Sequence, residues 1–198
     1  MTSYWTITQN SDGFFKDRGS KFHSFAFPVD SEEDVKMALE ALRKEYYDAR
    51  HHCYAYVLGM EQQQTRANDD GEPGHSAGDP ILGQIRSFGL TNVLVVVIRY
   101  FGGTKLGVGG LIQAYKTAAE DALQKVTKHE IYPVVRFELN YAYDETTAAE
   151  RLLGLFELKF IERVYEASCR VVAEIRAEQY EQLIAANEPP HQLSIRVV

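Results

Sequence analysis

The chain of 198 residues has only two cysteines, Cys53 and Cys169. Two cysteines are too few for a disulfide framework, and a zinc site would need a second Cys/His pair besides the one at 51–53. The longest aliphatic run, Val93–Ile98, is far shorter than the ~20 residues of a membrane helix, and the N-terminus lacks the basic and apolar regions of a signal peptide. We therefore expect a soluble cytoplasmic protein without a membrane contact.

Positive charge is also scarce. Lysine and arginine number 21 against 28 aspartates and glutamates, which gives a formal net charge of −7. A nucleic-acid footprint over the whole surface is therefore not expected, and any RNA contact would need a local basic patch. The stretch F-F-K-D-R-G-S-K-F-H at 14–23 interleaves cations with aromatics, a pattern that suits either a single-strand contact or a solvated sheet edge.

Nucleotide-binding motifs are absent from the one glycine-rich segment, 102–110, which holds five of the fourteen glycines. A Walker A loop requires lysine at the position of Val108, and a dinucleotide fingerprint requires glycine at that of Ile112. The segment nevertheless lies between a predicted buried strand at 92–100 and a predicted helix at 111–126. A strand, loop and helix in this order can direct free backbone N–H groups at an anion, or can simply allow tight packing.

The anion-binding interpretation gives a first set of candidate residues. In it, the N–H groups of Gly107, Gly109 and Gly110 bind phosphate or carboxylate, while Arg99 and Lys105 supply positive charge. The full set in this segment is Arg99, Tyr100, Gly102, Gly103, Lys105, Gly107, Gly109 and Gly110.

The polar loop at 68–80 supplies a second set, the carboxylates of Asp69, Asp70 and Glu72 followed by Pro73. Hard oxygens at this density could hold a divalent metal or act as an acid–base pair. The alternative is a solvated turn stiffened by the proline. Both interpretations stay open, and in the binding hypothesis this loop shapes the rim of the site.

The predicted strand at 53–59 supplies a third set. Alternation places His52, Tyr54 and Tyr56 on one face, and Cys53 on the other face among small apolar residues, as a buried thiol. If the first face is open, His52 and Tyr54 can stack on bases or on a peptide. The alternative is that this face packs under a helix.

The chain as a whole predicts an α+β protein of two domains, 1–130 and 131–198, with a linker at 127–133. Ser31 and Asp34 resemble a capping box at the start of the first long helix. Further elements of the first domain are a strand at 22–29 and a helix that Asp79 and Pro80 begin and that runs to about Ser87.

The second domain is predicted to consist of a strand at 134–143, a helix at 145–157 with a Thr147–Glu150 capping box, strands at 159–166 and 168–176, a helix at 178–187 and a strand at 192–198. This β-α-β-β-α-β order is the ferredoxin-like signature.

The chain carries, in this order, the blocks S-K-F, F-P-V-D-S-E-E, H-H-C-Y-A-Y, N-D-D-G-E-P, A-G-D-P-I-L and L-T-N-V-L-V-V-V-I-R-Y-F-G-G-T-K-L-G-V-G-G-L-I-Q-A-Y. Together they resemble the IMPACT/YigZ family over about residues 18–125. One departure is Gly74-His75-Ser76, where the family often has Ser-Gly-Thr.

The resemblance implies that domain 1–130 has the fold of the second domain of a small-subunit ribosomal protein, which is also that of the fourth domain of elongation factor G: a β-sheet with helices on one face. It implies that 131–198 resembles the fifth domain of that factor. Eukaryotic relatives regulate translation under amino-acid starvation by binding a protein partner of the initiation kinase pathway. Nucleic-acid binding is the usual interpretation for bacterial members, and no catalytic residue carries over.

We therefore expect a non-enzymatic regulatory protein linked to translation, with RNA, the ribosome or a translation factor as its partner and with no cofactor. One alternative is a phosphate- or nucleotide-dependent enzyme in which Asp69, Asp70 and Glu72 hold a metal beside the glycine-rich segment. The other is a protein-interaction module without an RNA role, which the acidic balance favours over RNA.

Overall fold

The computed structural model describes residues 3–166, 168–187 and 193–198. The chain divides into two compact units, Ser3–Ile131 and Tyr132–Val198. Both combine antiparallel sheets with helices, so the predicted α+β class is confirmed. No helix within the described ranges is long and apolar enough to cross a membrane.

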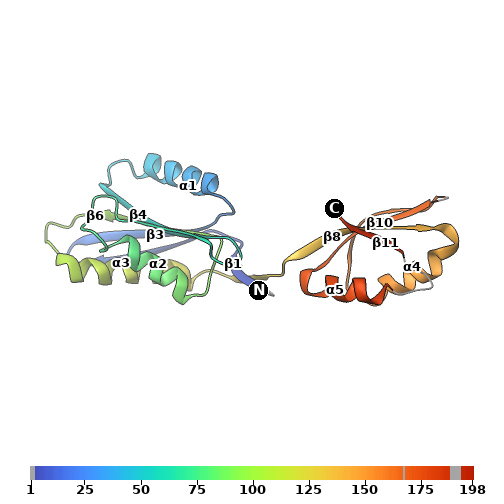
Figure 1. The fold of residues 1–198 in the computed structure, drawn as a ribbon. Helices are drawn as coiled ribbons and strands as arrows, with labels where there is room; N and C mark the ends of the chain where they lie inside the picture. The colour runs from blue at the N-terminus through green and yellow to red at the C-terminus, as the bar shows by residue number, and fades with distance from the viewer. Residues whose placement is uncertain (1–2, 167, 188–192) are drawn as a thin grey trace. The chain divides into compact units, whose positions relative to one another are not determined.

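The first unit is built, within its described residues, on a five-stranded antiparallel sheet in the order β2-β3-β6-β4-β5 (Figure 1). Its elements are β1 (Tyr4–Ile7), β2 (Ser11–Asp17), β3 (Ser20–Pro28), α1 (Glu32–Glu45), β4 (His51–Leu58), β5 (Gln64–Asn68), α2 (Gly78–Ser87), β6 (Val93–Tyr100), α3 (Gly107–Gln124) and β7 (Lys128–Ile131).

Helix α1 covers one face of this sheet, and α2 and α3 cover the other (Figure 1). The central strands need both covers, because β6 buries every residue from Val93 to Arg99 and β4 buries His52 to Leu58. If either face of a strand that is apolar on both faces were left in water, the favourable free energy of burying that face would be lost. The expectation of helices on one face only is therefore wrong.

Helix α1 begins as the sequence predicts. Its N-cap is Ser31, whose Oγ accepts a hydrogen bond from the N–H of Asp34 at 3.2 Å. The Asp34 carboxylate in turn accepts from the N–H of Asp30 at 3.0 Å and from the Ser31 hydroxyl at 2.8 Å. The predicted capping pair is confirmed, with aspartate in the place that glutamate usually takes.

The polar segments of the first unit differ from the prediction. Strand β7 lies inside the predicted linker and pairs with β1. Strands β1, β2 and β5 were not predicted either, because they are short or polar and local alternation does not mark them. Helix α2 begins at Gly78, one position before the predicted cap, and α3 begins at Gly107 instead of Leu111.

The second unit follows the predicted β-α-β-β-α-β order, with strand order β11-β8-β10-β9 across its antiparallel sheet. Its elements are β8 (Val134–Ala142), the short 3₁₀ helix η1 (Tyr143–Glu145), α4 (Thr146–Leu153), β9 (Lys159–Val164), β10 (Ser168–Arg176), α5 (Ala177–Ala186) and β11 (Ser194–Val197). Helix α4 has Glu145 as its N-cap with no side-chain hydrogen bond, so the predicted capping box at Thr147 is wrong. Residue 192 of the predicted last strand lies outside the described residues.

Replacing Ser31 by alanine should lower the free energy of unfolding of the first unit by about 1 kcal/mol, because the Asp34 N–H loses its acceptor. Ser31→Asp is the matched control, since aspartate caps helices as well as serine does. Urea unfolding followed by circular dichroism compares the three proteins. Equal midpoints for Ser31→Ala and the unchanged protein would contradict a stabilising cap.

Candidate functional site

Asp69 fastens the polar loop to the start of α2. Its Oδ1 accepts hydrogen bonds from the N–H groups of Ala77 and Gly78 at 2.9 and 2.8 Å, and its Oδ2 accepts one from His75 at 2.8 Å. Helix α2 has no cap from the side chain of Ala77, so Asp69 serves its N-terminus from a distance. Burial alone raises the pKa of Asp69, but the three N–H donors outweigh it and hold that pKa below its usual value.

Asp70 ties the same loop to the beginning of β4. Its Oδ2 accepts the N–H of His52 at 2.7 Å, and its carbonyl oxygen lies 2.9 Å from Nδ1 of His51. A carbonyl can only accept, so Nδ1 of His51 carries the proton. The backbone of Asp70 has φ of 40°, an uncommon conformation for a residue with a side chain, and these bonds hold it there.

Glu72 lies buried behind the loop, with its side chain 4% exposed. Its Oε1 accepts from Nη1 of Arg99 at 2.7 Å and from the Tyr115 hydroxyl at 2.8 Å. Arg99, with a side chain 7% exposed, also lies 3.4 Å from Oγ of Ser20. The Cys53 sulfur is 3.3 Å from the Tyr115 hydroxyl, and burial raises the pKa of both groups, so both stay protonated. The network joins the loop to β3, β4, β6 and α3.

The three carboxylates of the loop thus bind the protein's own groups. In the part of the chain that the structure describes, no group of three or more His, Cys, Asp and Glu side chains could hold a metal ion. His75 pairs with Asp79 on the surface at 2.7 Å, and Pro73 is exposed in the turn. The alternative of a solvated turn is incomplete as well, because the buried ion pair of Glu72 with Arg99 holds this loop in place.

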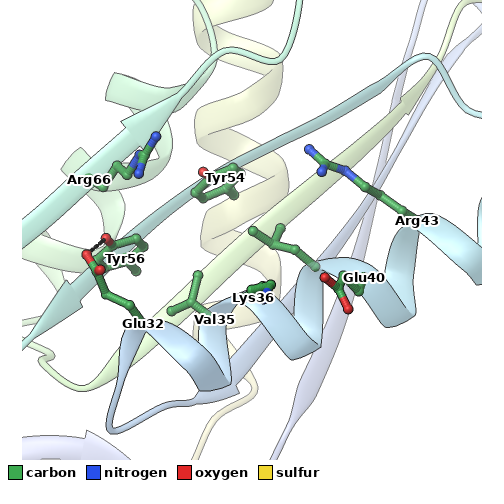
Figure 2. A pocket seen from close by; sticks show the side chains of 9 residues that line it. Glu32, Val35, Lys36, Glu40, Arg43, Tyr54, Tyr56 and Arg66 are labelled. Atoms are coloured by element: carbon green, nitrogen blue, oxygen red, sulfur yellow. Dashed lines mark hydrogen bonds between the residues drawn. The ribbon is translucent and has the colours of Figure 1, made fainter.

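The strand face that carries His52 and Tyr54 is covered. His52 is 5% and Tyr54 8% exposed, and Tyr54 packs in the core under α1. Burial lowers the pKa of His52, which keeps its ring neutral. The stacking interpretation needed an open face, and His52 does not have one. Part of the Tyr54 side chain lines a groove between α1 and β5 (Figure 2).

The first glycines of the glycine-rich segment have structural explanations. A Cβ on Gly102 would lie 1.8 Å from the carbonyl carbon of Gly19 and 2.0 Å from the nitrogen of Ser20, so only glycine fits. Gly103 and Gly107 have φ of 89° and 73°, which residues with side chains rarely adopt. Tight packing and turning therefore explain these three positions without a ligand.

The N-terminus of α3 is open. Its N-cap, Leu106, makes no side-chain hydrogen bond, so the N–H groups of Gly107, Val108 and Gly109 have no partner within the helix. Helix geometry pairs the Gly110 N–H with the Leu106 carbonyl, which removes Gly110 from the predicted N–H donors. No atom outside the helix lies within 4 Å of a Cβ built on Gly109, so that position is open to solvent.

Tyr100 and Phe101 lie between two cavities at the end of β6. One cavity, of about 410 Å³, is also lined by Lys21 and Tyr46, and the other, of about 400 Å³, by Arg50. Phe101 is 58% exposed. A hydrogen bond to Asp48 raises the pKa of Tyr100 to about 12, so its hydroxyl stays neutral.

We call Tyr100–Gly110 together with Lys21, Tyr46 and Arg50 the loop surface. It contains predicted residues, among them Lys105, which is exposed and has no ion pair within the described residues. Its other members were missed. Lys21 belongs to the aromatic and cationic stretch at 14–23, which was the available signal, whereas nothing local connects Tyr46 and Arg50 with β6. Glu72 lies behind this surface, where it holds Arg99, the residue before Tyr100.

The effects of mutating Glu72 and Arg99 on the free energy of unfolding should be strongly coupled. Glu72→Gln and Arg99→Met should each lower the free energy of unfolding by ~3–5 kcal/mol, because each leaves a buried partner uncompensated. The double variant should cost clearly less than the sum of the two. Urea unfolding measures all four proteins, and the exposed Lys125–Asp121 pair, at 2.9 Å, is the control with a coupling of about 0.5 kcal/mol. If the losses of stability in the two single variants simply added in the double variant, the ion pair would not be stabilising the fold.

Asp69 should make stability depend on pH. Its folded-state pKa lies below that of the unfolded chain, so ionised Asp69 stabilises the fold above about pH 4 and this contribution is lost as the pH falls toward the folded pKa. Asp69→Asn should therefore be less stable at pH 7, with the difference shrinking toward pH 3. Urea unfolding of both proteins across that range measures it, and a difference independent of pH would contradict the assignment.

The family model described as the Impact N-terminal domain matches residues 18–123. IMPACT family member YigZ of Escherichia coli (strain K12) is 39% identical over 150 residues, which cover 75% of this chain and 74% of that protein. IMPACT family member YvyE of Bacillus subtilis (strain 168) is 36% identical over 126 residues, which cover 64% of this chain and 58% of that protein.

Two solved structures extend the comparison. A crystal structure of a hypothetical protein aligns with 100% of this chain and 98% of its own, at a TM-score of 0.71 and 32% identity. The structure described as the two-domain translational regulator Yih1 aligns with 62% of this chain and 47% of its own, at a TM-score of 0.37 and 30% identity. The family match includes the polar loop, β6 and the glycine-rich segment. The chain therefore belongs to the IMPACT family, and residues 18–123 are its match to the Impact N-terminal domain.

Proposed function

We propose that this protein is a non-enzymatic regulator linked to translation, and that it contacts ribosomal RNA through the loop surface. The observation that carries the proposal is the half-buried Tyr100 beside the exposed Phe101, which together lie between cavities lined by Lys21 and Arg50. The link to translation comes from the family resemblance. As a partner of the ribosome, the protein would act in the cytoplasm.

The chemistry of the loop surface suits an RNA strand. Exposed aromatic rings stack on bases of any sequence, and neighbouring cations contact the phosphates. Beyond Phe101 the chain leads through Lys105 to the uncapped N-terminus of α3, whose free N–H groups favour an anion. A local patch of this kind is what a protein with a net charge of −7 requires for RNA binding.

The enzyme alternative has less support. It needed Asp69, Asp70 and Glu72 as metal ligands, but each of these carboxylates accepts hydrogen bonds from the protein itself. The protein-interaction alternative keeps one observation in its favour, because an exposed phenylalanine such as Phe101 also suits a protein partner. Sensitivity of the interaction to nuclease separates these two kinds of partner.

The proposal also includes a fold similarity for each of the two units. The first unit would share the fold of the second domain of a small-subunit ribosomal protein, and the second unit would be ferredoxin-like, as in the fifth domain of elongation factor G. The strand order β11-β8-β10-β9 supports the second likeness. The first stays a prediction from the resemblance.

Co-sedimentation with purified ribosomes across a salt series tests the proposal. Gly109→Asp adds a negative charge among the free N–H groups of α3, and a carboxylate there favours the helix itself, so we expect an intact fold and lost binding. Gly109→Ala is the matched control, because its Cβ meets open space and adds no charge. The affinity of Gly109→Ala for ribosomes should be within about twofold of that of the unchanged protein. This corresponds to a difference in binding free energy well under about 1.4 kcal/mol.

Lys105→Glu adds a second variant at the same surface. Its expected effect is weaker binding with a shallower salt dependence, reduced by about one phosphate contact. Equal binding of Gly109→Asp and Gly109→Ala, with an unchanged salt slope for Lys105→Glu, would remove the loop surface from the interaction. Absence of sedimentation by the unchanged protein at low salt would overturn the ribosome as the partner.

A further inference from the structure

A groove lies between α1 and the edge strand β5 (Figure 2), and it shares no lining residue with the loop surface. Its volume is about 370 Å³. The floor is Tyr54 of β4, and the apolar side chains of Val35 and Leu39 form the wall on α1. Arg66 of β5 stands on the opposite side. The groove thus combines an apolar body with polar groups at its edges, as small-molecule sites do.

Two guanidinium groups face each other across this groove. Figure 2 shows Arg66 on one side of Tyr54 and Arg43 on the other, both turned toward the tyrosine. Arg43 lies 3.5 Å from Oδ1 of Asp70, which holds it in place from behind. Within the described residues, no carboxylate lies within ion-pair distance of Arg66. Arg66 also interacts with the hydroxyl of Tyr56. A planar guanidinium carries several N–H donors, so each arginine keeps donors that match the oxygens of an anion.

The tyrosine between the two arginines is also free to bond. The hydroxyl of Tyr54 has no hydrogen-bond partner among the residues that the structure describes, although the residue is 8% exposed. The neighbouring Tyr56 differs, because its hydroxyl donates to Oε1 of Glu32 at 2.6 Å. The groove therefore presents one unused hydroxyl between two arginines. Its lining also includes two carboxylates, that of Glu32, which accepts the bond from Tyr56, and that of Glu40.

We propose that this groove binds a phosphate monoester of about nucleotide size. Arg43, Arg66 and the Tyr54 hydroxyl hold the phosphate, while Val35 and Leu39 contact the body of the ligand. Phosphate fits better than carboxylate, because these donors approach from different sides and a phosphate group offers three oxygens in a tetrahedral arrangement, whereas a carboxylate offers two in one plane. Lys36, on the same wall, lies 3.7 Å from a carboxylate oxygen of Glu33 at the rim. None of these residues belongs to the loop surface, so the two proposals stand independently.

Isothermal titration calorimetry of the full chain tests the groove with three probes: AMP, adenosine and inorganic phosphate. AMP should bind saturably, and both partial ligands should bind at least about tenfold more weakly, because each lacks half of the contacts. Arg66→Gln should weaken AMP binding about tenfold or more, and Tyr54→Phe should weaken it while keeping the ring. Arg86→Gln on α2, a surface arginine outside the groove, is the matched control and should bind AMP like the unchanged protein.

Three results would overturn the proposal. The first is no saturable binding of AMP up to about 10 mM, the weak end of specific recognition. The second is equal affinity for AMP and adenosine, which would remove the phosphate from recognition. The third is equal affinity of Arg66→Gln and Arg86→Gln for AMP, which would locate binding elsewhere. Circular dichroism of each variant confirms the fold beforehand, and Arg66 lies on an exposed edge strand where glutamine is tolerated.

Discussion

The buried pair of Glu72 and Arg99 is the constraint on which the loop surface depends. Withdrawing two charges from water is costly, and the pair offsets that cost only with close geometry and further hydrogen bonds. Tyr115 supplies one such bond to Glu72, and Ser20 lies within reach of Arg99. The guanidinium also lies 5.6 Å from the ring centre of Phe101. The position of the Phe101 ring is therefore tied to the charge of Arg99 buried beside it.

The acidic loop shows how part of the chain's negative charge is satisfied inside the fold. Each of its carboxylates is turned toward protein donors: Asp69 to the start of α2, Asp70 to the start of β4 and Glu72 to Arg99. Their negative charge is thereby balanced inside the first unit, leaving cations such as Lys105 exposed on the loop surface. Net charge counted over a sequence does not show this division, because it depends on which charges are paired in the fold.

Sequence reasoning succeeded where a signal is local. The capping pair Ser31 and Asp34, the buried strand β6 and the element order of the second unit all follow from spacing of a few residues. It failed where partners are distant, as for β7, whose pairing with β1 spans almost the whole first unit. Alternation placed Tyr54 on the right face of β4, but only tertiary packing reveals that α1 covers that face. The hydrogen bond that Arg99 donates to Glu72 could not be predicted from the sequence for the same reason.

Gly109 differs from the other glycines near it. Close approach explains Gly102, positive φ explains Gly103 and Gly107, and at Gly110 a Cβ would come within 3.0 Å of the Leu106 side chain. At Gly109 the backbone is helical and a side chain would meet no atom. Glycine in a helix interior costs up to about 1 kcal/mol relative to alanine. Gly109 lies in the first turn of α3, and no close contact or positive φ requires glycine there. Its N–H group also has no partner within the helix, so the backbone at Gly109 is open to the approach of another molecule.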